Sequence, residues 1–313
     1  MNFLKNWTLP ISMLLGVASY FAYVNIPVFD NTHSFVNTFI SYLQPALIFC
    51  MLFISFCKVN PRDLKPHAWM VKPLAIQALS FILMGALIIS LPEIPGRVVI
   101  ESAMLCMICP TATAAVVVTT KLHGNPNAVV SYTCIINLAA SLLIPAIVPF
   151  LHESQDPNMT FETSFLLIMG KVFPLLILPL LTSWFVRYLI PNLHAKIKQR
   201  SDIAFYAWAL ALALAIAVTV KAIVHSDESI WELLGIAIAS LICCLIQFGL
   251  GRAIGRRHNE TIAGTQMLGQ KNTVFIIWAG YTFLNPVTAM AGGFYSVWHN
   301  VINSYQLWKE RKQ

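Results

Sequence analysis

Long, continuous apolar runs alternate along the chain with short segments rich in proline, asparagine, glycine and charge. Runs such as residues 74–91 and 203–220 approach the roughly 20 residues that a helix needs to cross a bilayer. They lack the alternating polarity of strands in a transmembrane barrel. The pattern therefore predicts ten membrane-spanning helices, near residues 7–27, 36–57, 69–91, 98–120, 127–151, 168–190, 203–224, 231–251, 261–283 and 287–307.

The composition supports this interpretation. Of 313 residues, 58% are hydrophobic and only 11% are charged, whereas soluble domains carry about a quarter of their residues as charges. Ten spans with short connectors use the whole length, so we expect residues 1–313 to form one membrane domain without a soluble catalytic unit. The seven cysteines lie in or beside apolar runs, which indicates buried thiols instead of a disulfide framework.

The basic residues predict the orientation in the membrane. The net charge of +7 is spread over short loops and is not gathered into a patch with aromatic residues, so we expect no nucleic-acid partner. With Lys5 in the cytoplasm, 16 of the 20 lysines and arginines lie on that side and only Arg97 and Lys221 on the other. This bias places both termini in the cytoplasm, in a protein of the cell's inner membrane.

Two spans at corresponding positions contain polar interruptions. Residues 109–113 of the fourth span read Cys-Pro-Thr-Ala-Thr, and residues 269–273 of the ninth read Gly-Gln-Lys-Asn-Thr. The chain divides into five-helix halves, about 1–155 and 156–313, which would be inserted with opposite orientation. Paired broken helices indicate a transporter binding site, since their freed backbone groups must face protein or a water-filled cavity. Half-helix N-termini aimed into such a cavity favour an anion.

Lys271, inside the second interruption, is the most informative single residue. An ionisable side chain near the bilayer centre costs about 2.5–3.5 kcal/mol on insertion scales, so a functional role is favoured. The alternative is a lysine that snorkels or fills a gap. For Lys171 a structural role is favoured over a functional one. The sixth span can begin after this residue, so its side chain can snorkel outward.

Motifs over essentially the whole chain resemble the bile acid:sodium symporter family and its bacterial relatives. The motifs are Cys109-Pro110 with Thr113-Ala114, Gly124-Asn125 in the following turn, Asn272, and Ser296-Val297-Trp298-His299-Asn300. The resemblance implies an all-α fold of ten helices in two inverted five-helix repeats, with a panel that moves against a core. It also implies that the broken helices four and nine cross at the centre.

The sodium ligands of that family are absent. Sodium-coupled members have Ser-Asn where this chain has Ala115 and Val116, and Glu and Gln where it has Met267 and Lys271. Hard cations need several oxygen ligands, commonly with a carboxylate. We therefore expect neither bound sodium nor another metal or cofactor.

The resemblance also suggests which polar residues form the site. Thr113 and Asn272 match residues that approach substrate in relatives, although such side chains can simply satisfy freed backbone groups. Asn137 is a further substrate candidate, and an interhelical hydrogen bond explains it equally well. We expect Lys271 to act in coupling with Gln77 as a neighbour. His299 and Trp298 are interpreted as packing residues.

These features favour a sodium-independent secondary transporter of an organic anion, either a bile acid or steroid conjugate or a small carboxylate. Lys271 would replace a bound cation, as a permanent charge or as a group that exchanges a proton, which makes the proton a candidate coupling ion. The partners would be the anion and the bilayer. No motif of an intramembrane enzyme is present in the sequence, so we expect no enzyme. The alternative is a non-transporting membrane sensor that keeps the fold.

Overall fold

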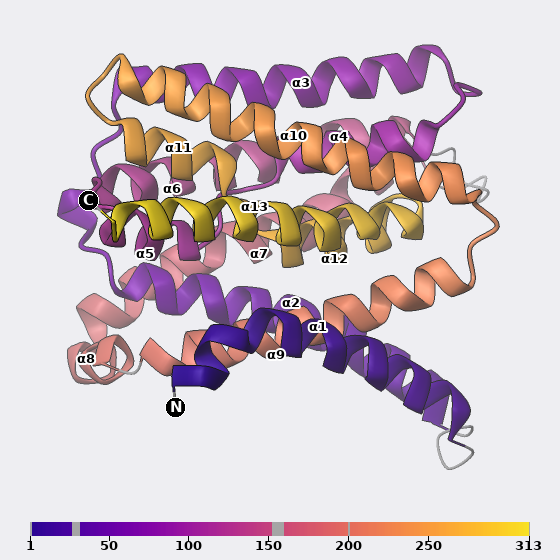
Figure 1. Cartoon of the computed structure of the whole chain (residues 1–313), viewed down its shortest axis with the longest axis horizontal. Coiled ribbons are helices and arrows are strands. Elements are labelled where there is room, and N and C mark those ends of the chain that lie inside the picture. Colours follow the sequence, from indigo (N-terminus) through magenta and orange to yellow (C-terminus); the bar gives the residue numbers. More distant parts are fainter. Residues whose placement is uncertain (1, 27–31, 152–159, 200, 313) are drawn as a thin grey trace.

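The computed structural model describes residues 2–26, 32–151, 160–199 and 201–312, and this part of the chain is built of helices (Figure 1). The first half contains α1 (Asn2–Asn25), α2 (His33–Cys57), α3 (Val71–Ser90), α4 (Arg97–Ile108), α5 (Ala114–Lys121) and α6 (Pro126–Ile147). The second half contains α7 (Phe161–Leu189), α8 (Pro191–Gln199), α9 (Ser201–Val224), α10 (Ile230–Arg256), α11 (Thr261–Gly269), α12 (Thr273–Phe283) and α13 (Met290–Glu310). Short 3-10 turns η2 (Pro61–Asp63), η3 (Ala68–Met70), η4 (Val148–Phe150) and η5 (Pro286–Ala289) join them.

Six helices of the described chain are long and apolar enough to cross a membrane: α2, α3, α6, α7, α9 and α10. Their outer surfaces expose large apolar side chains such as Leu83, Leu166 and Ile238, as a lipid environment requires. The other four predicted spans coincide with α1, with α13 and with two pairs of shorter helices, α4 with α5 and α11 with α12. The protein is thus an all-helical, multi-pass membrane protein, and its division into inverted repeats stays a prediction.

One helix was not expected from the apolar pattern. Residues 191–199 lie in a predicted connector, yet they form α8, which has no buried residue and carries Lys196 and Lys198 in its last turn. The pattern of spans does not detect it, because α8 is too short and too polar to cross a bilayer.

The helices form two groups. In the first, α1 packs on α9, and α2 packs on both α7 and α9. In the second, α10 packs on α4, α11 and α13, while α3 packs on α4 and α6. Figure 1 shows α3 and α10 along one edge, α1, α2 and α9 along the opposite edge, and the short helices between them. The packing of α6 on α7 joins the two groups. We call α1, α2, α7 and α9 the outer group and the remaining spans the central group.

A contact between glycines sets the position of α11 on α10. A Cβ atom on Gly251, Gly255 or Gly264 would meet backbone atoms of the facing helix, so only glycine allows the two backbones to approach this closely. Because α11 is the first half of the interrupted ninth span, this contact determines where the interruption lies.

Candidate functional site

Each interruption begins and ends for a local reason. After α4 ends at Ile108, Pro110 cannot donate a backbone hydrogen bond to continue the helix. After α11 ends at Gly269, Asn272 starts the next helix as its N-cap, with its side chain accepting a hydrogen bond from the Phe275 N–H at 3.3 Å. Two short non-helical segments, residues 109–112 and 270–272, therefore lie within the helical protein.

The two non-helical segments pair with one another in antiparallel fashion at Thr111 and Lys271. The Ala112 N–H donates to the Gln270 carbonyl at 2.9 Å, and the Asn272 N–H donates to the Pro110 carbonyl at 2.9 Å. This pairing satisfies backbone groups that lipid could not satisfy, so each interruption stabilises the other. The structure brings the two together although they are about 160 positions apart in the sequence.

Side chains satisfy the carbonyls at the ends of the first half-helices. Gln77 Nε2 donates to the Met107 carbonyl at 2.7 Å and to the Cys109 carbonyl at 3.2 Å. At the corresponding position of the other half, Gln247 Nε2 donates to the Cys106 carbonyl at 3.1 Å.

A buried tyrosine supports each of these glutamines. The Tyr132 hydroxyl donates to Gln77 Oε1 at 2.6 Å, while the Tyr295 hydroxyl accepts from Gln247 Nε2 at 3.1 Å and donates to the Gly269 carbonyl at 2.8 Å. Both halves of the chain thus use a glutamine and a tyrosine to hold the two paired segments at Thr111 and Lys271, which we call the crossing.

Lys271 is completely buried at this crossing, with 0% of its surface exposed. Its Nζ atom has no hydrogen-bond partner in the described part of the chain. The groups that interact with it electrostatically are thiols, those of Cys106 and Cys109 at the end of α4 and of Cys243 and Cys244 on α10. Taking an ammonium out of water without such a partner is costly, so its retention here needs a compensating role.

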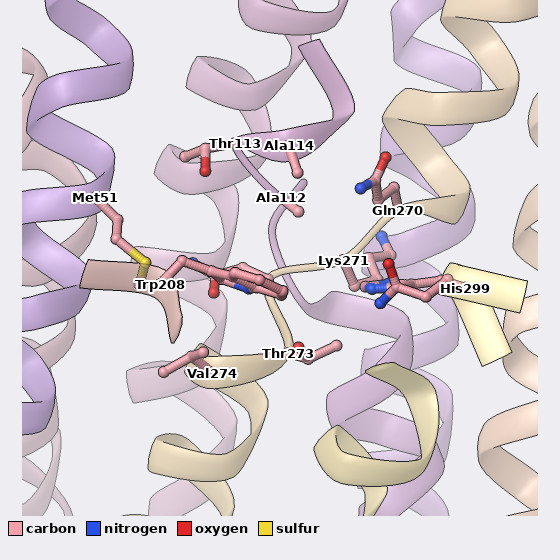
Figure 2. A pocket seen from close by; sticks show the side chains of 12 residues that line it. Met51, Ala112, Thr113, Ala114, Trp208, Gln270, Lys271, Thr273, Val274 and His299 are labelled. Atoms are coloured by element: carbon pink, nitrogen blue, oxygen red, sulfur yellow. The ribbon is translucent and has the colours of Figure 1, made fainter. Parts of the chain in front are cut away.

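A small cavity of about 60 Å³ lies beside the crossing, between the outer and central groups. The first residues of α5 and α12 line it, so the N–H ends of both second half-helices lie at its wall. Figure 2 shows the side chains of Met51 and Trp208, from α2 and α9, on one side and those of Gln270, Lys271 and His299 on the other. The full lining is Met51, residues 112–114, Trp208, residues 270–274, His299 and Asn300.

The residues proposed from the sequence fall into two sets. Thr113, Lys271 and Asn272 line the cavity together. The Gln77 side chain bonds the Met107 and Cys109 carbonyls at the end of α4, and it makes no hydrogen bond to Lys271 in the described structure. Asn137 is buried between α6 and α7, where its Nδ2 donates to the Leu176 carbonyl at 3.2 Å.

The positions at which the resemblance predicts lost sodium ligands lie around the crossing. Ala115 and Val116 are on the first turn of α5, and Met267 is on the last turns of α11. Ala115 and Met267 are both fully buried, and the Met267 carbonyl accepts from the Thr111 hydroxyl at 2.6 Å. The described residues contain no group of three or more His, Cys, Asp or Glu side chains that could hold a metal ion.

The cavity also contains residues that the sequence did not single out. Met51 and Trp208 lie within ordinary apolar spans, and nothing in the local pattern distinguishes them from lipid-facing or core residues. His299 and Asn300 belong to the Ser-Val-Trp-His-Asn motif. Within it, Trp298 makes a packing contact, since its Nε1 donates to the Ser240 hydroxyl at 3.1 Å, whereas His299 turns to the cavity.

The fold and the site define a class: a polytopic helical membrane protein whose two interrupted helices meet at a central cavity. A family model for the SBF-like CPA transporter family matches residues 10–285. The chain therefore belongs to this family, which is of the bile acid:sodium symporter type. No curated protein matches the sequence significantly. Family membership and the apolar helices together indicate a membrane transporter.

Proposed function

We propose that the protein is a sodium-independent secondary transporter of an organic anion, working by alternating access around the crossing. The observation that carries the proposal is the buried Lys271 side chain at the wall of the cavity, whose Nζ has no hydrogen-bond partner among the described residues. The protein would lie in a lipid bilayer, which we infer to be the inner membrane, and both chain termini would be in the cytoplasm.

The electrostatics of the cavity favour a negatively charged ligand. The N-terminal ends of α5 and α12 supply partial positive charge, as helix ends do at anion sites. When its amine is protonated, Lys271 adds a full positive charge at the same place. Trp208 and Met51 offer an apolar wall for the rest of the molecule, and Thr113, Asn272 and Asn300 offer hydrogen bonds. A carboxylate on an organic body fits both features.

Alternating access is supported by where the cavity lies. It opens between the outer and central groups, so relative movement of these groups would expose it to one side of the membrane and then the other. The inverted repeat gains support from matched partners: Gln77 with Tyr132 in one half, and Gln247 with Tyr295 in the other.

Sodium independence follows from side-chain chemistry. Ala115, Val116 and Met267 offer no side-chain oxygen, and Lys271 adds a positive charge that repels a cation. The lysine provides the positive charge that a bound ion supplies in sodium-coupled relatives. It does so either permanently, which gives facilitated movement of the anion, or by exchanging a proton during the cycle, which gives proton coupling.

The direct test is uptake of radiolabelled anions into proteoliposomes, using a panel that spans steroid conjugates and small carboxylates. We expect uptake of at least one class to remain unchanged when sodium is replaced by choline or potassium. A strong sodium requirement would contradict the proposal.

A non-transporting sensor is the second candidate, because lost sodium ligands remove the driving force of relatives. A sensor would bind an anion, seen as a rise in melting temperature with ligand concentration, and would fail to accumulate it in the same liposomes.

A further inference from the structure

A stripe of polar side chains leads away from the central cavity along α13. His299, Asn303, Gln306 and Glu310 follow one another at spacings of four, three and four residues, which places them on one face of the helix. His299 and Asn303 are 5% and 4% exposed, Gln306 is partly buried, and Glu310 is at the surface end of the helix. The stripe thus runs from the buried centre to the end of α13.

Two glutamines lie beside this stripe, Gln266 on α11 and Gln270 directly after the end of α11. Gln266 and Gln270, which are four residues apart and 0% and 3% exposed, lie on the same side of the chain. Gln266 Nε2 donates to Asn303 Oδ1 at 3.2 Å and to Gln306 Oε1 at 2.7 Å. Polar side chains therefore join α11 to α13 inside the protein.

These side chains leave buried polar atoms without a hydrogen bond. In the described part of the chain, Gln266 Oε1, Gln270 Oε1, His299 Nδ1 and Asn303 Nδ2 all lack a partner. Turning an amide by 180° exchanges which of its atoms is unpaired but does not add a partner. Each unpaired atom costs about 1–3 kcal/mol, and bound water that makes two to four hydrogen bonds is the usual way in which proteins avoid that cost.

Both ends of the stripe reach an open region. At the inner end, His299 and Gln270 line the central cavity. At the outer end, Glu310 Oε1 lies 4.0 Å from His123 Nε2. His123 in turn lines a surface hollow together with Thr261 and Ile262, at the start of α11.

We propose that the stripe binds a file of water molecules, which connects the central cavity to the cytoplasmic surface between α11 and α13. The ligand is water, held by the unpaired atoms of Gln266, Gln270, His299 and Asn303. This path lies inside the central group and is separate from the opening between the groups that the substrate would use. The inference rests on the proposed function only for its orientation, in which the C-terminal end of α13 is cytoplasmic.

Thiol labelling tests the path without any transport measurement, so its result does not depend on whether the protein transports an anion. Asn303→Cys and Gln266→Cys place a thiol in the stripe, and Val301→Cys, at a similar depth but 60% exposed on the outer surface of α13, is the matched control. Inside-out vesicles are treated with silver ion, a thiol-reactive cation close to water in size, and the loss of free thiol is compared with that of the unsubstituted protein.

We expect the thiol of at least one stripe variant to react roughly tenfold faster than that of Val301→Cys, because the reactive thiolate forms in water and not in lipid. Adding Gln306→Phe to the reactive variant should slow its labelling to the control rate by closing the outer end. Equal rates for both stripe variants and the control would overturn the proposal. So would labelling that Gln306→Phe does not slow, because the reagent would then arrive through the substrate opening.

Discussion

At the residue scale, the energetics of the site centre on one buried charge. The Lys271 ammonium has no hydrogen-bond partner within the described chain, whereas the peptide groups around it are paired across the crossing. Keeping an ionisable group at such a depth costs about 2.5–3.5 kcal/mol on insertion scales. A group that destabilises the empty protein by this much is well placed to stabilise a bound anion.

Replacing Lys271 therefore separates stability from function. We expect Lys271→Met to raise the melting temperature, because a buried unpaired charge is removed. We expect the same variant to lower anion uptake by roughly thirtyfold or more, since losing a buried charge pair costs about 2 kcal/mol or more. Uptake in proteoliposomes and thermal denaturation measure the two effects.

Two comparisons make this result specific. Lys171→Met is the matched control, because the Lys171 side chain is exposed and does not line the cavity. Its Nζ lies 5.9 Å from the centroid of the Phe283 ring. Uptake by the Lys171→Met variant should stay unchanged. Lys271→Arg keeps the charge but cannot deprotonate, so accumulation driven by a pH gradient in this variant would rule out the proton-exchanging form.

Two asparagines, one in the cavity lining and one outside it, allow the predicted substrate contacts to be tested. Asn272→Leu removes the cap of α12 and a polar group of the cavity wall, so we expect inserted protein that does not take up anion. Asn137→Leu removes a bond between α6 and α7, which costs about 0.6 kcal/mol on average. We expect a slightly lower melting temperature and an unchanged KM. A raised KM for Asn137→Leu would instead place this side chain at the substrate.

At the scale of elements, the crossing depends on how closely its helices approach their neighbours. The short helices α4, α5, α11 and α12 have eight to twelve residues each, too few to cross the bilayer alone. Their positions come from tertiary contacts: the paired segments at Thr111 and Lys271, and the glycine contact that holds α11 on α10.

That contact predicts a difference between two glycines. A Cβ on Gly264 would lie 2.8 Å from the Gly255 Cα, so Gly264→Ala should push α11 from α10 and cost about 1–3 kcal/mol. Gly249→Ala, on α10, meets nothing within 4 Å and should stabilise the helix by about 0.5–1 kcal/mol. Thermal denaturation in detergent compares them, and equal melting temperatures would show that the contact does not restrict α11.

At the scale of the whole molecule, charge and shape lead to an orientation. Basic residues concentrate at one end of the predicted spans, and both termini belong to that end. Figure 1 shows the N-terminus and the C-terminus toward the same side of the view, which agrees with an even number of crossings.

Reporter fusions test this orientation. Alkaline phosphatase, which is active only outside the cytoplasm, should be inactive when fused after residue 312 and active when fused after Asp227, in the connector between α9 and α10. Green fluorescent protein should give the reverse pattern. Activity of the C-terminal phosphatase fusion would contradict the number of spans or their orientation.

The sequence alone determined the local features of this protein. Apolar runs of about 20 residues define membrane helices because crossing a bilayer is a matter of length and polarity within one segment. Pro110 and the polar residues 270–273 mark the interruptions, since a missing N–H and helix-capping side chains also act locally. Lys271 stood out for the same reason, because a charged residue inside an apolar span is visible in the sequence itself.

Only the tertiary structure decided which of these features meet. Thr111 pairs with Lys271, Gln77 binds α4 carbonyls, and Asn137 joins α6 to α7 away from the cavity. Trp208 and His299 reach the cavity through the rotation of α9 and α13 about their axes. Apolar helices match many neighbours almost equally well in lipid, where small residues and a few polar contacts choose the packing. Their rotation therefore depends on partners distant in the chain, which a local pattern does not specify.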